Sequence, residues 1–473
     1  MKKIMLICPP DTGNVEIKRR YCFSPVDAMP FSMRVCNSIA RIGAALKSDY
    51  EVFVRDYKSE KLSHLSLLDD VLSFDPDVVY METSAVTLFS DLRTLRTVKS
   101  STKNAPVILK GDVFFDADED FLKNINLSCV DYLVGADEHN VVPRIINSLF
   151  SGSENIENIP FILYKKDGFF VKNDFSAKVS NFDEAPFPDR NFLKNRLYVM
   201  PESQHLSAVI DTVSGTSGKT IFDNGPQNYS VRSAKKVFEE MSDCFENHGI
   251  RSFCFHDPLF TSDSERVFEL CNLINSSNLQ NEVRLFVACD IKTFNGATAM
   301  KLKETGCRSV IFPFISGSDF ILKKNGFDYT SEDCRNAAEI AQKAKLKIFG
   351  IYITGFADED ENTMTETRKL IIDVNAERFY TAILLPYPCA KSEKIALEES
   401  IIKEPLLKET GVKIPPPRTK FLTTRELLKF RRHTKILTYV NPGYILKRTG
   451  EAVKSPYVAV SCLRKIYYKI IGK

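Results

Sequence analysis

The stretch Ala208-Val-Ile-Asp-Thr-Val-Ser-Gly-Thr-Ser-Gly-Lys-Thr-Ile-Phe-Asp223 joins a short apolar run to a loop of glycine, serine and threonine. A helical pattern follows at residues 234–247, so this part of the chain predicts a strand, a loop and a helix. The same order recurs on both sides of the stretch. Repeated alternation of strands and helices indicates an α/β fold.

After this stretch, five more apolar runs alternate with helical patterns up to about residue 400. The predicted strands are 208–212, 252–256, 283–288, 309–314, 347–353 and 379–385, and the helices between them are 234–247, 264–275, 297–305, 332–344 and 361–374. Six strand–helix units are fewer than the eight of a closed (β/α)₈ barrel. We therefore expect residues 205–400 to form an open partial (β/α)₆ barrel.

Before this stretch, residues 1–150 show the same alternation with near-continuous apolar strands. The predicted strands are 3–8, 51–55, 77–82, 107–110 and 130–134. Such runs indicate a doubly wound, Rossmann-like domain with helices on both faces, whose ligand binds at the carboxyl ends of the strands. The first loop has no G-x-G-x-x-G, so a nicotinamide or flavin dinucleotide is not expected. Residues 151–204 are turn-rich, with one short apolar run at 160–164, and predict a linker that contains one hairpin.

The composition is that of an ordinary globular protein, with 473 residues of which 26% are charged. No apolar run reaches the ~18 residues of a membrane span, and the first apolar run is too short for a signal peptide, which predicts a cytoplasmic protein. Twelve cysteines occur without a Cys-x-x-Cys pair. A disulfide framework or a zinc ribbon is therefore not expected, and we predict no metal site.

The C-terminal region, 401–473, is basic and helical in pattern. Residues 418–473 carry fourteen Lys and Arg against two Glu. The segment 458–471 is amphipathic and cationic, which suits packing on the barrel, a solvated helix face or an interfacial helix in peripheral contact with a membrane. Nucleic acid is not an expected partner, because no recognised binding fold accompanies the charge.

Several segments, taken in order, carry a resemblance to a known family. They are Asp75-Pro-Asp-Val-Val79, Asp131-Tyr-Leu-Val-Gly-Ala-Asp-Glu138, Pro186-Phe-Pro-Asp-Arg190, Phe255-His-Asp-Pro258, Gly317-Ser-Asp319, Ile353-Thr-Gly-Phe-Ala-Asp-Glu359 and Pro386-Tyr-Pro388. With the two-domain pattern, they resemble the cobalamin (B12)-binding radical S-adenosylmethionine (SAM) superfamily over residues 1–400. The resemblance implies cobalamin between the domains, near Thr83, Ser84, Gly111, Asp112, Gly135 and Glu138.

The sequence departs from this family where active members place three cysteines spaced Cys-x-x-x-Cys-x-x-Cys. Those positions hold Thr216, Thr220 and Asp223. Iron–sulfur clusters need deprotonated thiolates, which hydroxyls and a single carboxylate do not replace. We therefore expect no iron–sulfur cluster. An Asp-x-His-x-x-Gly signature is also absent after Asp56, so no histidine is expected on cobalt.

The loop that lacks these cysteines keeps Gly215, Thr216, Gly218 and Lys219. Backbone N–H groups and a lysine favour an anion, which predicts weak binding of the SAM carboxylate or of a phosphate. The loop also approaches a phosphate-loop pattern, with Val213 in place of the first glycine. Gly225-Pro226 prevents the helix that such a loop requires, so nucleotide hydrolysis is the lesser alternative.

Polar residues that follow two barrel strands are candidates for acid–base catalysis. His256 and Asp257 end one predicted strand, and Asp290 follows the next. Catalytic groups of barrels lie at these ends, although a structural His-Asp pair explains the first two equally well. His139, in a polar helix start, fits a capping role.

Two functions stay open at this point. One is a corrinoid- or SAM-dependent transferase of the methyltransferase type that uses non-radical chemistry. The other is a pseudoenzyme that binds or regulates an intact radical SAM homologue. Bound corrinoid in the purified protein distinguishes the first from the second.

Overall fold

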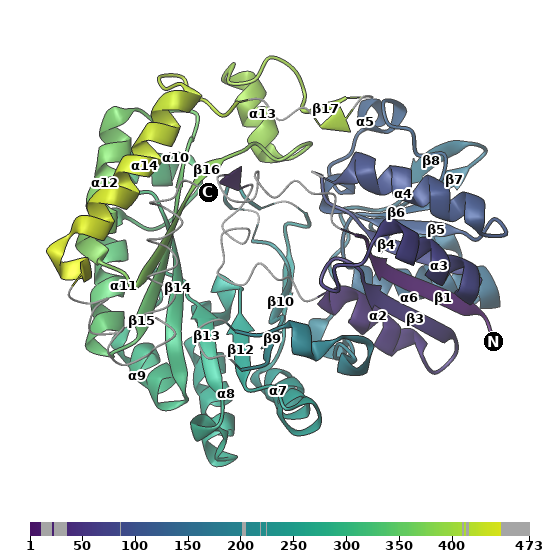
Figure 1. Cartoon of the computed structure of the whole chain (residues 1–473), viewed down its shortest axis with the longest axis horizontal. Coiled ribbons are helices and arrows are strands. Elements are labelled where there is room, and N and C mark those ends of the chain that lie inside the picture. Colours follow the sequence, from purple (N-terminus) through teal and green to yellow (C-terminus); the bar gives the residue numbers. More distant parts are fainter. Residues whose placement is uncertain are drawn as a thin grey trace.

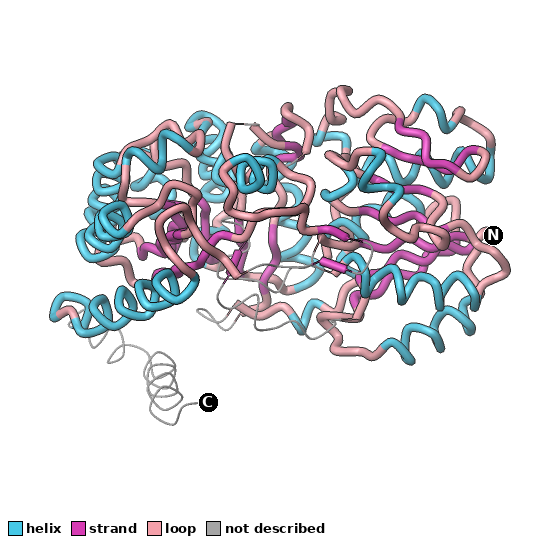
Figure 2. The backbone as a smooth tube through the Cα atoms, turned by 90° about the horizontal axis from the view of Figure 1, so that it is seen from above, coloured by secondary structure: helices cyan, strands magenta, loops and turns pink. Residues whose placement is uncertain are grey.

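The computed structural model describes residues 1–10, 21–22, 36–85, 87–200, 205–217, 219–223, 225–408, 411–412 and 416–445. They form two α/β lobes that lie side by side (Figures 1 and 2). The N-terminus lies at the outer end of the first lobe, away from the second. None of the described helices is both long and apolar enough to cross a membrane.

The first lobe contains a seven-stranded sheet in the order β3-β1-β4-β5-β6-β7-β8. Its strands are β1 (Lys3–Cys8), β3 (Glu51–Asp56), β4 (Val78–Glu82), β5 (Val107–Lys110), β6 (Tyr132–Val134), β7 (Ile162–Lys166) and β8 (Phe169–Lys172). The first five strands in this order are parallel, and the β7–β8 hairpin adds two antiparallel strands. The carboxyl ends of the parallel strands therefore share one edge of the sheet.

Helices cover both faces of this sheet. Side chains on a strand alternate between the two faces, so an apolar strand such as β1 packs against helices on both sides. Met5 and Ile7 pack under α3 and α4, whereas Ile4 and Leu6 pack under α2 and α6. The helices of the lobe are α2 (Asn37–Leu46), α3 (His64–Phe74), α4 (Leu88–Ser101), α5 (Glu119–Lys123) and α6 (Glu138–Ser151). The lobe is therefore doubly wound, as predicted.

The second lobe is built on a curled parallel sheet in the order β2-β16-β15-β14-β13-β12-β9. The strands are β2 (Tyr21–Cys22), β9 (Ser207–Val209), β12 (Ser252–Phe255), β13 (Arg284–Ala288), β14 (Cys307–Ile315), β15 (Lys347–Thr354) and β16 (Arg378–Leu384). Helices α7 (Ala234–His248), α8 (Ser264–Ser276), α9 (Gly296–Glu304), α11 (Ser331–Lys343) and α12 (Glu361–Val374) cover its outer face (Figure 1). The α/β class and the open barrel are thereby confirmed.

Five elements of the second lobe were not predicted, and β2 is the most unexpected. It comes from the N-terminal part of the chain yet pairs with β16 through Ile383↔Tyr21 and Leu384↔Cys22. The others are the hairpin of β10 (Val213–Gly215) and β11 (Tyr229–Val231), and the short helices α10 (Asp319–Lys324) and α13 (Lys391–Glu398). Helix α14 (Thr424–Val440) lies within the C-terminal region that was predicted to be basic and helical, whereas the segment 458–471 lies outside the described residues.

A buried ion-pair cluster joins the two lobes. Arg190, at the end of the linker, donates to Asn37 Oδ1 of α2 at 2.9 Å and to Glu240 Oε1 of α7 at 3.1 Å. Arg232 donates to the second oxygen of Glu240 at 2.5 Å. Arg190, Arg232 and Glu240 are each at most 2% exposed. Since α2 and α7 belong to different lobes, this cluster sets how the lobes face each other.

The opposite side of the interface is apolar. Tyr387 and Cys389, which follow β16, pack against the core cluster of the first lobe that contains Phe114 and Phe121. The lobes are therefore joined at two separate places, the arginine cluster and the loop after β16. The strand ends of the first sheet lie between them, toward the second lobe (Figure 1).

Replacing the central arginine of this interface should destabilise the whole protein. Arg190→Met removes the donor to Glu240 Oε1 and to Asn37 Oδ1 inside the buried cluster, and we expect a loss of about 3–5 kcal/mol in the free energy of unfolding. Arg251→Met is the control, because it breaks an ion pair with Glu282 between half-exposed side chains. That loss should stay below about 1 kcal/mol. Urea denaturation monitored by circular dichroism gives both values, and equal losses would contradict the structural role of Arg190.

Candidate functional site

The carboxyl edge of the first sheet gathers ionisable side chains from four adjacent strands. Asp56 ends β3, Cys8 ends β1, Glu82 ends β4 and Lys110 ends β5. The parallel register pairs Cys8 with Asp56 and Glu82 with Lys110, so the strand order alone places these residues side by side. Ligands of doubly wound sheets bind at this edge.

Lys110 is the cation of this edge, and carboxylates surround it. Its Nζ lies 2.7 Å from Asp112 Oδ1. Although burial alone would lower it, the carboxylates of Asp112, Glu138 and Glu82 raise the pKa of Lys110. Burial raises the pKa of Glu82, whose Oε1 accepts hydrogen bonds from Ser38 and, at 3.2 Å, from Tyr80. The edge therefore offers both hydrogen-bond donors and acceptors to a polar ligand.

Two other predicted cofactor contacts are used by the chain itself. Thr83 Oγ1 donates to Asp91 Oδ2 at 2.7 Å, inside α4. Ser84 Oγ lies 3.0 Å from Thr87 Oγ1, and the Ser84 carbonyl accepts from the amide of Leu88. Both residues thus help to start α4. Their role in cofactor binding stays a prediction.

The glycines of this edge lie close to other side chains rather than beside open space. A Cβ at Gly111 would lie 2.9 Å from Thr83 Cγ2. At Gly135 it would lie 2.7 Å from Phe175 Cε1 and 3.0 Å from Phe115 Cα. The absence of a side chain at both positions therefore serves close packing. A cofactor bound at this edge would contact the polar side chains of the edge, because the space beside these two glycines is already filled.

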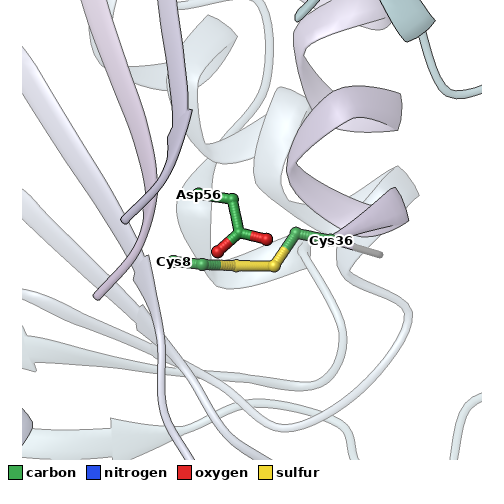
Figure 3. A group of neighbouring side chains, drawn as sticks. All are labelled: Cys8, Cys36 and Asp56. Carbon is green, nitrogen blue, oxygen red and sulfur yellow. A yellow bond between two sulfur atoms is a disulfide. The ribbon is translucent and has the colours of Figure 1, made fainter. Parts of the chain in front are cut away.

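A second group at the same edge was not predicted. Cys8 and Cys36 form a disulfide, and a carboxylate oxygen of Asp56 and the two sulfur atoms lie within 4.8 Å of one another (Figure 3). Cys36 precedes α2, which packs on the sheet face that Cys8 occupies. The only signal in the sequence is that Cys8 ends one predicted strand and Asp56 directly follows another.

In the barrel, the loop at the positions of the family's cluster cysteines is held by Asp223. Its Oδ2 accepts from the amide of Thr220 at 2.7 Å, from Thr220 Oγ1 at 3.0 Å and from Ser217 Oγ at 3.3 Å. Thr216 Oγ1 donates to the carbonyl of Pro226 at 3.0 Å. Hydrogen bonds within the loop thus join these positions, and two hydroxyls and one carboxylate do not fit a four-iron four-sulfur cluster.

The same loop packs into the apolar interior of the barrel. Ile221 is 4% exposed and belongs to the inner core cluster with Ile315, Phe356 and Leu384. The Phe222 ring lies 6.1 Å from that of Phe356, centre to centre. Since the other three residues lie at or just beyond the ends of barrel strands, this loop covers part of the barrel mouth.

The predicted anion site is only partly described. Gly215 has φ +91°, and a Cβ there would lie 2.2 Å from the carbonyl oxygen of Asn228, so only glycine fits. Lys219 is exposed, and its carbonyl lies against Gly326. Gly218 lies outside the described residues. The hydroxyl of Ser217 and the amide and hydroxyl of Thr220 donate to the Asp223 carboxylate. These loop donors, which were expected to bind an external anion, therefore already bond to Asp223.

The acid–base candidates of the barrel lie on neighbouring strand ends but have separate partners. Asp257 Oδ2 accepts from Thr212 Oγ1 at 2.8 Å. Asp290 Oδ1 accepts from the amide and hydroxyl of Thr293 at 2.9 and 2.8 Å. Catalytic roles for His256, Asp257 and Asp290 stay predictions. His139 is buried, with Nε2 3.1 Å from Ser180 Oγ and 3.3 Å from Asp137 Oδ1, which is a structural contact with the linker.

Glu359 is a further buried acid, in the segment 353–359 that follows β15. It is fully buried, and its Oε2 accepts a hydrogen bond from the amide of Gly355. Among the residues that the structure describes, Oε1 has no hydrogen-bond partner. Burial raises the pKa of Glu359 to about 8. The side chain is therefore protonated at neutral pH.

Known proteins share this architecture. No protein-family model matches the chain. The chain is 23% identical to an uncharacterized methyltransferase of Pyrococcus horikoshii over 439 residues, which cover 91% of this chain and 94% of the other. Among solved structures, the radical SAM methyltransferase TsrM from Kitasatospora setae superposes with a TM-score of 0.64 and 15% identity, covering 84% of this chain and 76% of that one.

The cobalamin-dependent radical SAM enzyme OxsB superposes with a TM-score of 0.64 and 12% identity, covering 93% of this chain and 62% of that one. The chain has the fold of the cobalamin-binding radical SAM enzymes. TsrM was solved with cobalamin and a four-iron four-sulfur cluster, and OxsB with aqua-cobalamin and SAM. The predicted relation to this superfamily is confirmed at the level of the fold.

The buried acid Glu359 predicts a pH-dependent stability. Its folded-state pKa of about 8 lies above the ordinary value of 4.5, so the folded state keeps a proton that the unfolded state releases. Stability from this group is present at low pH and falls as pH rises across that window. Glu359→Gln should reduce the fall in the urea midpoint between pH 5 and pH 8, measured at intervals of about one pH unit. Glu366→Gln, at an exposed position of α12, should not, and identical profiles for both variants would contradict this assignment.

Proposed function

We propose that the protein is a cobalamin-binding transferase of the methyltransferase type that works without an iron–sulfur cluster. Its support is threefold. The chain shares its fold with a radical SAM methyltransferase and nearly its full length with an uncharacterized methyltransferase. The carboxyl edge of the first sheet is polar, and the barrel loop is held by a carboxylate instead of thiolates.

The observation that carries the cluster-free part is the hydrogen bonding of Asp223. Its carboxylate accepts from Ser217 and Thr220, so the residues at the three ligand positions already bond to groups of the chain. The free cysteines that the structure describes lie outside this loop, and all except Cys389 are buried. Burial also raises the pKa of thiols such as Cys254 and Cys289, which disfavours the thiolate form that iron requires.

Lys110, Asp112 and Glu138 are the side chains that would hold cobalamin. The corrin ring carries several amide groups, which need both hydrogen-bond donors and acceptors, and this part of the edge supplies both. Cobalamin, when bound, supplies a cobalt centre that accepts and donates methyl groups. The buried His139 is committed to Ser180 and Asp137, which supports binding without histidine on cobalt.

The chain's own contribution to such a transfer would be to position groups and hold protons. Lys110 would fix a carbonyl or an anionic group by a charge-assisted hydrogen bond. Glu82, whose pKa is raised by burial, would hold a proton more readily than an exposed carboxyl and donate it to a leaving group. These roles need no radical intermediate.

Anaerobic reconstitution with iron and sulfide tests the cluster-free proposal. We expect no stoichiometric iron and no cluster absorbance in the wild type, because thiolates are missing at Thr216, Thr220 and Asp223. The triple variant Thr216→Cys, Thr220→Cys, Asp223→Cys restores the ligand spacing and is the positive control. A four-iron absorbance band in the wild type would overturn the proposal.

Titration with hydroxocobalamin tests the cofactor. We expect a change in the corrin spectrum and a higher melting temperature on binding. Lys110→Met should weaken the affinity by about 1–2 kcal/mol, the size of one charge-assisted contact. Lys103→Met is the matched control, since Lys103 is highly exposed and pairs with Asp75. No spectral or thermal change in the wild type would contradict cobalamin binding.

A non-catalytic partner of an intact radical SAM enzyme is the second candidate. It is favoured by Ile221 and Phe222, which pack from the altered loop onto the inner core of the barrel. Calorimetry with SAM on the wild type and on Lys219→Ala addresses it. Heat that falls in the variant supports the transferase, whereas no heat from SAM and no response to cobalamin favour the partner role.

A further inference from the structure

Cys8, Cys36 and Asp56 form a group of potential metal ligands at the carboxyl edge of the first sheet (Figure 3). Cys8 and Asp56 are paired neighbours on β1 and β3, and they are 6% and 3% exposed. Cys36 directly precedes α2. Each of the three residues therefore comes from the end of a regular element, which fixes the group more firmly than a surface loop would.

The carboxylate of Asp56 is held in place by two neighbours. Oδ1 accepts from the amide of Ser59 at 2.9 Å, and Oδ2 accepts from Ser59 Oγ at 2.5 Å and from Tyr198 OH at 3.1 Å. These hydrogen bonds fix the orientation of the carboxylate, as hydrogen bonds to a metal-ligating carboxylate do. They also leave acceptor capacity on a carboxylate, which has about four lone-pair sites.

Asp56 has no counter-charge in the part of the chain that the structure describes. Its partners there are hydroxyls and one amide, and no Lys or Arg forms an ion pair with it. A buried carboxylate usually has a paired cation or a bound metal, because taking a charge out of water is costly. A cation beside Asp56 and the two sulfur atoms would supply the missing charge.

We propose that the reduced form of Cys8 and Cys36 binds a thiophilic divalent cation, with Asp56 as the third ligand, and that the disulfide closes this site. Two thiolates and one carboxylate are a ligand set that Zn²⁺ accepts, and three protein ligands leave its fourth tetrahedral position for water or a substrate. The Cα atoms of Cys8 and Cys36 are 6.9 Å apart. This separation allows the sulfur atoms to move apart around an ion without a change of fold.

The chemistry is a two-electron exchange followed by metal binding. A dithiol reductant gives two electrons and two protons to the disulfide, which yields the two thiols and the oxidised, cyclic disulfide of the reductant. Zn²⁺ then binds the two sulfur atoms as thiolates, and the two thiol protons pass to water or buffer. A two-electron oxidant such as diamide would take up the two electrons as the S–S bond forms again, which would release the ion.

Metal titration of the full-length protein tests the proposal. The protein is reduced with dithiothreitol, freed of reductant without oxygen and titrated with Zn²⁺ against a chromophoric chelator. We expect one equivalent to bind to reduced wild type and none at this site after oxidation with diamide. Cys36→Ser should abolish this binding, and Asp56→Asn should weaken it by about 10-fold or more.

A spectroscopic readout and a matched control keep the test specific. Co²⁺ in place of Zn²⁺ should show a thiolate-to-cobalt charge-transfer band that Cys36→Ser removes. Cys389→Ser, which removes a half-buried thiol elsewhere, should bind like the wild type. Binding that is equal in the reduced wild type and the Cys8→Ser, Cys36→Ser double variant would overturn the site. Unchanged binding in Asp56→Asn would overturn the three-ligand assignment, and neither outcome depends on whether cobalamin binds.

Discussion

The buried contact of Glu240 with Arg190 and Arg232 is the constraint on which the arrangement of the two lobes depends. Each charge has lost nearly all contact with water, and that loss is offset only while all three side chains keep their partners. Arg190 comes from the linker, Glu240 and Arg232 from the barrel, and Asn37 from the first lobe. The cluster is satisfied in one relative orientation, so it specifies the interface as well as stabilising it.

The position of this cluster decides which part of the second lobe faces the carboxyl ends of the first sheet. With the arginine cluster on one side and Tyr387 and Cys389 on the other, these strand ends lie between the lobes. Lys110 and Glu82, which end two of these strands, therefore face the second lobe, whereas the side chain of Asp112 is exposed. A large ligand held there would contact both lobes.

The barrel loop that contains Thr216, Thr220 and Asp223 is held in place by groups of the chain itself. A carboxylate at position 223 takes hydrogen bonds from its own loop, and the neighbouring Ile221 and Phe222 fill apolar space inside the barrel. The loop thus keeps its place by hydrogen bonds and packing, the usual means of ordering a loop without metal. The first lobe, by contrast, carries a cysteine pair beside a buried carboxylate that the family resemblance did not suggest.

Local pattern was enough to predict most elements, because apolar strands and amphipathic helices are set by neighbouring residues. The bounds of β1 and β5 match the prediction, and the residues at positions 216, 220 and 223 could be read without any structure. Tertiary structure alone decided the pairing of β2 with β16 and the contact of Cys8 with Cys36, which lie 28 residues apart. It also placed Phe175 against Gly135 and gave Asp223 its partners. Such contacts depend on how elements far apart in the chain pack together. Neither the type of a residue nor its spacing in the sequence specifies which distant element it contacts.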